Sequence, residues 1–395
     1  MNTSTTVQDY PVAQWEENGG AHTLRWRSEK NAPPPKKIIP VDDTFTADQA
    51  YQLACEGIAL LWRGDFQNGK QLLQALARRA DRPSKKSRRN PKKETKQNMA
   101  DVFNHHRLSQ SQRARTLSMV VVEVNTKHQI ELRRAPDIQV ACQEALGDVK
   151  ENYIISLRDL QGFVGAHEWR KKGIHIPELE GVGDSHIHPH YGVFSPIRGE
   201  YIQLLDKAPL PRALMEESLA FDIGTGTGVL AALLAKRGVK KIVATDQDPR
   251  ALVCANENIK RLGLKKYIQV QDANLFPEGK AALIICNPPW IPGRPSAPIE
   301  YAIYDPGSKM LKGFLSGLAE HLLPNGEGWL ILSDIAEHLH LRKREELENW
   351  IKEAGLRVLN QLNTHPTHSK SLDATDPLYK ARSAEITSLW RLAVQ

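Results

Sequence analysis

The second half of the chain alternates short apolar runs with amphipathic segments, and this order limits the folds open to it. From Leu219 onward, the runs LAFDIG, KIVATD, YIQVQD and AALIICN indicate buried strands, and the helical segments TGVLAALLAKRG and PRALVCANENIKRLG separate the first three. Strands that alternate with helices form parallel sheets. A helix near 309–323, the strand GWLILSD, a helix near 341–354 and an antiparallel pair, LRVLNQL and EITSLWRL, complete the predicted order.

A glycine-rich stretch, FDIGTGTGVL, joins the first strand to its helix. Glycines here allow a tight turn and let a ligand approach the backbone closely. A dinucleotide site also has a glycine-rich turn at this place, but its fingerprint G-x-G-x-x-G differs from the G-T-G-T-G-V of this chain. We therefore expect a small ligand to contact Asp222, Gly224, Thr225, Gly226 and Gly228.

The next two strands also end in carboxylates. Asp246, followed by Gln247, ends the second strand, and Asp272, followed by Ala273, ends the third. Ligands of open α/β sheets bind at the carboxyl ends of the strands. If the ligand contains a nucleoside, Asp246 could accept hydrogen bonds from its two ribose hydroxyls, and Asp272 would lie level with its adenine ring. Helix capping or turn formation is the alternative role for both.

The fourth strand ends in Asn287-Pro288-Pro289-Trp290, which points to chemistry on a nitrogen atom. A planar NH2 group is a poor nucleophile, but carbonyls of the Asn287 side chain and the Pro288 backbone can each accept one of its hydrogens. They would hold the nitrogen so that its lone pair faces an electrophilic methyl group. The prolines fix the backbone, and Trp290 can stack on a flat acceptor. The alternative is a rigid strand end.

With these motifs together, the chain resembles the class I S-adenosylmethionine-dependent methyltransferases. The resemblance rests on DIGTGTG, on TD at 245–246, on QDANLF at 271–276 and on IICNPPW, which is also similar to the signature of adenine-N6 methyltransferases. Four stretches look like parts of the release-factor glutamine N5-methyltransferases: NPPWIP, ALVCANENIKRLGL, GFVGAHEW (162–169) and GVFSPIRGEY (192–201). GFVGAHEW is similar to the short hairpin of these enzymes, and SPIRGEY is a loose version of the proline-arginine-glutamate segment that follows it. In NPPW, tryptophan replaces the usual tyrosine. Residues 1–150 do not resemble the family's small helical domain.

The resemblance implies a Rossmann-like α/β class I methyltransferase domain with a mostly parallel seven-stranded sheet, over residues 206–395. It implies S-adenosyl-L-methionine as cofactor, bound by Gly224, Gly226, Asp246 and Asp272, with Asn287 and Pro288 holding the acceptor nitrogen. The acceptor could be a protein glutamine, an adenine or guanine amino group of RNA or DNA, or a small molecule. A non-catalytic nucleic-acid-binding module on the same fold is the alternative from another class.

The region before this domain is predicted to be smaller and of mixed α+β structure. Residues 1–45 contain PPP and few apolar side chains, so we expect a loose extension. In residues 46–150, a capping-box pattern at Thr46–Gln49 and an apolar run through Leu61 predict a helix, and residues 64–79 are predicted to form a second one. Residues 119–134 are predicted to form a β-hairpin, and IQVACQEAL a further helix. Residues 151–205 would connect this region to the methyltransferase domain.

The formal charge of +7 is concentrated in one stretch, because residues 78–96 hold ten Lys or Arg against two acids. Such a run attracts phosphate backbones, so it could contact RNA or DNA as part of substrate recognition. A solvated linker is the alternative. The macromolecular partner is therefore a translation protein or a nucleic acid.

Histidines and cysteines do not indicate a metal site. His186, His188 and His190 alternate as strand ligands could, but we expect them in a loop near the entrance of the site, and His365 and His368 at the surface. The four cysteines form no CxxC pair, and Cys286 lacks a neighbouring base. No signal peptide or membrane span is expected, so the predicted location is cytoplasmic.

Overall fold

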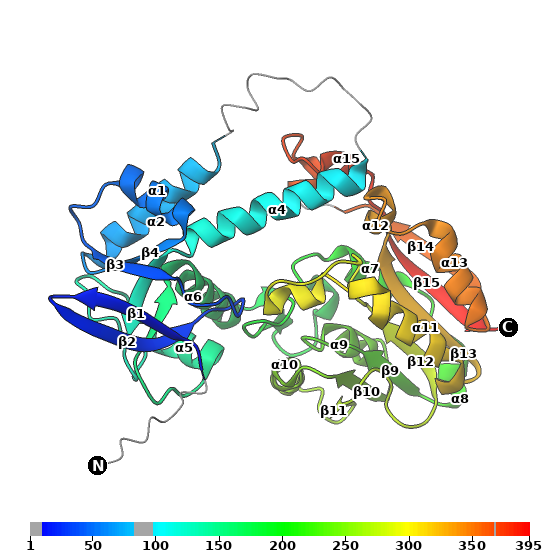
Figure 1. Cartoon of the computed structure of the whole chain (residues 1–395). Coiled ribbons are helices and arrows are strands. Elements are labelled where there is room, and N and C mark those ends of the chain that lie inside the picture. The colour runs from blue at the N-terminus through cyan, green and yellow to red at the C-terminus, as the bar shows by residue number, and fades with distance from the viewer. Residues whose placement is uncertain (1–9, 83–97, 367–368) are drawn as a thin grey trace, which may run out of the picture. The chain divides into compact units, whose positions relative to one another are not determined.

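The computed structural model describes residues 10–82, 98–366 and 369–395 (Figure 1). These residues form two compact units: residues up to 82 together with 104–168, and residues 98–103 together with those from Trp169 to Gln395. The boundaries fall inside α4 (Met99–Leu117) and α6 (Leu157–Lys172). The predicted connecting segment 151–205 is thus divided between the units. Within the described residues, no helix has both the length and the apolar character that crossing a membrane requires.

The larger unit is built on a seven-stranded sheet of order β11-β10-β9-β12-β13-β15-β14 (Figure 1). The first five strands of this order are parallel, and β15 runs antiparallel to both β13 and β14. This confirms the predicted mostly parallel sheet. The bounds are β9 (Leu219–Ile223), β10 (Lys241–Asp246), β11 (Ile268–Asp272), β12 (Ala281–Cys286), β13 (Leu322–Ser333), β14 (Leu356–Thr364) and β15 (Thr387–Val394).

Helices cover both faces of this sheet, so its central strands are buried on both sides. Neighbouring residues of β12 and β13 enter different clusters: Ile285 and Trp329 pack with α7, α9 and α10, whereas Ile284 and Leu330 pack with α11 and α13. Strands buried on both faces become continuous apolar runs, which explains AALIIC. The helices are α7 (Glu200–Lys207), α8 (Ala213–Glu216), α9 (Val229–Lys236), α10 (Pro249–Arg261), α11 (Lys309–His321) and α13 (Arg344–Glu353).

Shorter elements complete the larger unit. β7 (Ile174–His175) and β8 (His186–Ile187) pair as a two-stranded sheet. The remaining elements are η1 (Pro177–Leu179), η2 (Pro298–Ala302), η3 (Pro306–Ser308), α12 (Ile335–His338), α14 (Ser369–Leu372) and α15 (Tyr379–Ala384). The loops that follow β12 and β13 leave the same edge of the sheet, since these strands are parallel neighbours.

The smaller unit contains a six-stranded sheet of order β1-β2-β6-β5-β4-β3. Its strands are β1 (Val12–Glu17), β2 (Gly20–Arg27), β3 (Lys37–Val41), β4 (Ile58–Trp62), β5 (Val120–Val124) and β6 (Tyr153–Ser156). The prediction that residues 1–45 are a loose extension is therefore wrong for residues 12–41. β1 and β2 bury few side chains, among them Trp15 and Trp26, but they form a hairpin whose turn is Asn18-Gly19, with φ angles of 52° and 76°. Asn-Gly is the preferred sequence for such a turn, so this signal was present and was missed.

Three further predictions for this region need correction. The helix at Thr46 forms as α1 (Ala47–Glu56) with the predicted capping box, but it ends at Gly57 in the left-handed conformation, and residues 58–62 are the buried strand β4. Glycine commonly ends helices in this way. Of the predicted hairpin, only β5 forms, paired with β4 and β6. Residues 162–169, expected as a short hairpin, lie in α6, where Leu160 and Phe163 are buried. Two predicted helices are present, as α2 (Phe66–Ala80) and α5 (Gln139–Leu146).

Candidate cofactor and acceptor site

The glycine loop between β9 and α9 has the conformation that only glycine adopts easily. Gly224, Gly226 and Gly228 have φ angles of 70°, 55° and 81°. A Cβ atom on Gly224 would lie 2.5 Å from the Cε of Met310, so packing as well as conformation requires glycine there. A Cβ on Gly226 would meet nothing within 4 Å, so the loop faces open space at the position where a ligand was expected.

Asp222 lies fully buried beneath this loop with one oxygen unsatisfied. Its Oδ2 accepts hydrogen bonds from Thr225 Oγ1 (2.7 Å) and from the Ala231 amide (3.1 Å), whereas its Oδ1 has no hydrogen-bond partner among the described residues. Burial raises the pKa of Asp222 to about 6. A buried carboxylate with a vacant acceptor atom favours a cationic or hydrogen-donating ligand.

Asp246, at the end of β10, lies against the glycine loop as expected from the strand order. Its Oδ2 accepts from the Gly226 amide (3.0 Å) and its Oδ1 from the Asp248 amide (3.0 Å). Each carboxylate oxygen has further lone pairs, so both can still accept hydroxyl groups. Burial raises the pKa of this carboxyl group too.

Asp272 and its neighbour reach the same edge of the sheet. Asp246 and Asp272 are partners in the parallel register of β10 and β11, and the Ala273 amide donates to the Asp246 carbonyl (3.2 Å). The side chains of Asp272 and Gln247 are exposed. The strand ends thus bring the glycine loop, Asp246 and Asp272 together, as the sequence predicts.

The NPPW motif lies beside this loop, because β12 is the parallel neighbour of β9 and Cys286 pairs with Ile223. The indole N–H of Trp290 donates a hydrogen bond to Asn287 Oδ1 (2.9 Å), a contact that the sequence did not reveal. Trp290 is half-buried and packs against residues of three hydrophobic clusters. Pro288 is buried, and Pro289 is half-buried. The motif therefore presents an amide whose oxygen is held by its own tryptophan.

Asp305, on the loop that follows NPPW, anchors the start of α11. The buried carboxylate accepts from the amides of Met310 and Leu311, both at 3.1 Å. This cap places Met310 against Gly224. Met310 was missed at the sequence level, because its contact depends on how the loop from Asn287 to Asp305 folds back.

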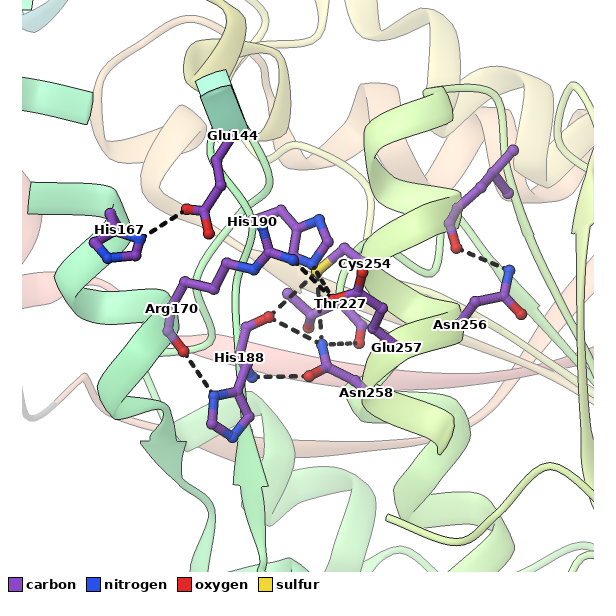
Figure 2. A network of polar contacts seen from close by, with 11 residues as sticks. Glu144, His167, Arg170, His188, His190, Thr227, Cys254, Asn256, Glu257 and Asn258 are labelled. Atoms are coloured by element: carbon purple, nitrogen blue, oxygen red, sulfur yellow. Dashed lines mark hydrogen bonds and ion pairs between the residues drawn. The ribbon is translucent and has the colours of Figure 1, made fainter. Parts of the chain in front are cut away.

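The HIHPHY segment forms a brace across α10 (Figure 2). Asn258, on α10, accepts from the His188 amide (2.8 Å) and donates to the carbonyls of His188 (3.3 Å) and Thr227 (3.0 Å). His190 Nε2 lies 2.9 Å from Glu257 Oε2. In the described part of the chain, no three His, Cys, Asp or Glu side chains are grouped so as to hold a metal. Asn258, which ties this segment to the glycine loop, was also missed, although an asparagine on the apolar face of a helix is a usable signal.

Other predicted features lie elsewhere. His365 is exposed, and His368 lies outside the described residues, as do Lys85, Lys86 and most of the basic stretch. Cys286 is buried, and burial raises the pKa of its thiol, so the reactive thiolate is disfavoured.

Comparison with known proteins agrees with this geometry. Residues 186–353 match the model of the methyltransferase small domain family. The chain is 33% identical to a release factor glutamine methyltransferase of Cereibacter sphaeroides over 31% of this chain and 51% of that one. It is 28% identical to a putative protein N5-glutamine methyltransferase of Methanocaldococcus jannaschii, over 46% of this chain and 89% of that one.

Two further matches are a ribosomal protein methyltransferase and a solved structure. A ribosomal protein L11 methyltransferase of Alkaliphilus oremlandii is 35% identical over 20% of this chain and 26% of that one. A solved methyltransferase from Pyrococcus furiosus is 19% identical, covers 60% of this chain and 98% of its own, and has a TM-score of 0.34. The chain spans about a quarter of the L11 methyltransferase and half of the release factor methyltransferase. The matched residues 186–353 run from β8 to the end of α13, so they include the glycine loop, Asp246, Asp272 and the NPPW motif.

Proposed function

We propose that the chain is an S-adenosylmethionine-dependent methyltransferase that methylates a planar amide or exocyclic amino nitrogen of a macromolecule. The observation that carries the proposal is the placement of Asn287, at the end of β12, beside the open glycine loop of β9. One site would then contain both a ligand-binding loop and a pair of carbonyl acceptors for an NH2 group.

The residues at the glycine loop fit this cofactor. The vacant Oδ1 of buried Asp222 suits an ammonium or sulfonium cation, and Gly226 leaves room for a ligand along the backbone. Asp246 can accept ribose hydroxyls, with Asp272 and Ala273 at the adenine side. The cofactor would supply an electrophilic methyl group. The residues that we propose to bind the cofactor are Asp222, Gly224, Thr225, Gly226, Gly228, Asp246, Gln247, Asp272, Ala273 and Asn287.

On the acceptor side, Asn287 and the Pro288 carbonyl would hold the nitrogen. The Trp290 indole occupies one lone pair of Asn287 Oδ1, and the second remains for an N–H of the acceptor. Preorganised acceptors of this kind favour the transition state, in which the nitrogen becomes pyramidal and gains positive charge.

A protein amide is the acceptor we favour, since the relatives that match include enzymes named for release factor glutamine and protein N5-glutamine. A nucleic-acid amino group is the second candidate. It is favoured by the ten Lys and Arg of residues 78–96, which end directly before the segment Asn98–Phe103 of the larger unit. A cytoplasmic location suits both acceptors.

Methyl transfer from labelled cofactor tests the proposal. Protein and RNA from a strain that lacks this gene would serve as acceptor pools, with the wild-type chain and Asn287→Ala compared. We expect label in protein with the wild type, and a rate about 10²–10³-fold lower for Asn287→Ala, because one preorganised polar contact is lost. Equal rates would contradict the assigned role of Asn287. Absence of label from both pools would contradict methylation of a macromolecule.

Cofactor binding is tested separately by calorimetry on Gly226→Ala. A methyl group there would enter the space left for the ligand, so we expect binding to be lost. Gly263→Ala is a matched control, because Gly263 also has a left-handed φ of 71° and open surroundings but lies outside the loop. If both variants bind alike, the cofactor does not lie along Gly226.

A further inference from the structure

Arg198 is an accessible guanidinium at the edge of the sheet that holds the candidate site. It stands two residues before α7, and its side chain is 33% exposed. Its Nη1 lies 3.5 Å from Oε1 of Glu385, whose side chain is 2% exposed. This contact is an ion pair without a hydrogen bond, and within the described residues the N–H groups of Arg198 donate to no other group. They therefore remain available to a ligand.

Glu385 fixes where this guanidinium lies. The Ser333 hydroxyl donates to Glu385 Oε1 (2.7 Å), the same oxygen that Arg198 approaches. Ser333 is the last residue of β13, and Glu385 stands two residues before β15, the antiparallel neighbour of that strand. Arg198 is therefore held at the edge where β13 ends and β15 begins.

The NPPW motif reaches this edge from the strand next to β13. Cys286 of β12 pairs with Leu330 of β13, so Pro289 and Ser333 each stand three residues beyond this pair. Ile331 packs in one cluster with residues of α7, and side chains alternate along a strand, so Ser333 points to the face that α7 covers. The glycine loop lies farther away, because β12 separates β9 from β13. Arg198 thus lies on the acceptor side of the sheet.

A single carboxylate is the anion that suits this group. The guanidinium fork donates two parallel hydrogen bonds to a two-oxygen anion. A nucleic-acid backbone needs several cations for its successive phosphates. Among the described charges that act on Glu385, the second cation is Arg382, whose Nε already lies 3.3 Å from Asp376 Oδ2. The edge therefore offers one available cation and not a row of them.

We propose that Arg198 binds a carboxylate of the methyl acceptor, which is a polypeptide with an acidic side chain near its methylated amide. Glu385 positions the guanidinium from its buried side, and the exposed side meets the acceptor. This role rests on the proposed function and narrows its substrate to an acidic polypeptide segment.

Labelled methyl transfer to protein from a strain that lacks this gene tests the contact. At limiting acceptor, transfer by Arg198→Met should fall about tenfold below the wild type, because a charge-assisted pair is lost, and the difference should shrink at saturating acceptor. Arg198→Lys, which keeps the charge without the fork, should lie between them. Arg261→Met is the matched control, because Arg261 is also accessible but ends α10, at the opposite edge of the sheet.

The two failures are distinguishable. If the wild-type chain transfers no methyl, the proposed function fails. If wild type and Arg198→Met transfer equally well at limiting acceptor, the proposed function stands and only the role of Arg198 is wrong.

Blocking the carboxylates of the acceptor protein with carbodiimide and ethanolamine tests the chemistry of the partner group. Transfer by the wild type should drop to the level of Arg198→Met, whereas the variant should lose less than about twofold, since its contact is already absent. Unchanged transfer by the wild type, or equal losses in both proteins, would overturn the proposal. If label instead enters RNA and Arg198→Met lowers that transfer, Arg198 binds a phosphate and the carboxylate assignment is wrong.

Glu385→Gln separates recognition from a structural role. This variant removes the buried charge but keeps an acceptor for the Ser333 hydroxyl. If Arg198 served only to neutralise Glu385, adding Arg198→Met to this background would leave transfer unchanged. We expect the added substitution to lower transfer at limiting acceptor by about threefold or more, because the contact with the acceptor is still lost. No loss in the Glu385→Gln background would overturn the inference.

Discussion

The hydrogen bond from Trp290 to Asn287 gives the fourth residue of the motif a task beyond stacking. An asparagine amide can rotate so that either its oxygen or its NH2 group faces a ligand, and only the oxygen can accept an N–H. A donor fixed on one side of the amide selects the orientation of the oxygen. Trp290 is well placed for this, since its ring is packed on several sides.

Trp290→Phe keeps an aromatic ring but removes this donor. We expect turnover to fall about tenfold, the effect of one hydrogen bond that orients a reacting group, with little change in acceptor KM. In an Asn287→Asp background, both side-chain atoms are oxygens and orientation no longer matters, so Trp290→Phe should change turnover less than about twofold. Single-turnover rates would be measured for the wild type, Trp290→Phe, Asn287→Asp and the double variant. Equal losses in both backgrounds would mean that Trp290 acts through ring packing alone.

Asp222 predicts a pH dependence of cofactor binding. Its pKa of about 6 in the unliganded protein means that the carboxylate becomes protonated as the pH falls through 6. A cationic cofactor prefers the charged form, so its affinity should be full near pH 7.5 and fall by about tenfold for each unit below 6. Calorimetry from pH 5 to 8 would measure this.

Asp222→Asn is the control, because it keeps an acceptor for Thr225 and Ala231 but cannot titrate. Its affinity should be low and should vary less with pH, with Asp246 responsible for the remainder. The unliganded variant should also be more stable than the wild type above pH 6, because the raised pKa shows that the charged form is disfavoured in the folded state. An unchanged pH profile would contradict a contact between Asp222 and the cofactor.

Among the elements, α10 joins the glycine loop to the HIHPHY segment, which crosses this helix. Asn258 is almost completely buried, and its amide satisfies backbone groups of both Thr227 and His188. Such a link holds the loop in its ligand-binding conformation before the ligand arrives.

Asn258→Leu should therefore destabilise the protein by about 2–4 kcal/mol, because it leaves buried backbone groups unsatisfied. Cofactor affinity should fall as well. Asn256→Leu is the matched control on the same helix: Asn256 is exposed and bonds only the Leu252 carbonyl of its own helix, so a change within about 0.5 kcal/mol is expected. Denaturant unfolding and calorimetry would measure both effects, and equal losses for the two variants would contradict the brace.

The elements also show why the sheet of the larger unit could be predicted and that of the smaller unit could not. Helices follow directly after β9 and β10, and β12 is a continuous apolar run, so the order of these strands and the residues at their ends can be inferred from sequence. The turn Asn18-Gly19 was a usable signal for the hairpin of β1 and β2, but β2 also pairs with β6 near residue 154, and no local pattern reveals that pairing. At the site, the strand-end residues were predictable, whereas Met310 and Asn258 gain their contacts from segments that fold back from elsewhere.

At the scale of the whole molecule, positive charge is concentrated in one stretch of the sequence that contains none of the motifs. The stretch 78–96 carries ten Lys or Arg and two acids, and it ends just before the segment Asn98–Phe103, of which Phe103 is buried in the cluster that includes Trp290. Whatever this stretch binds is therefore tethered to the unit that holds the candidate site. A phosphate backbone and an acidic protein surface are the two partners that its charge suits.

Salt dependence distinguishes these partners. Replacing Lys85, Lys86, Arg88 and Arg89 by glutamine removes up to four phosphate contacts. If the stretch binds RNA, each contact releases about 0.7 counterion, so the slope of log affinity against log salt should flatten by roughly 3. Filter binding of a single-stranded RNA from 50 to 300 mM salt would measure it. An unaltered slope in the fourfold variant would exclude phosphate contacts by these residues, and would favour a protein amide as the acceptor.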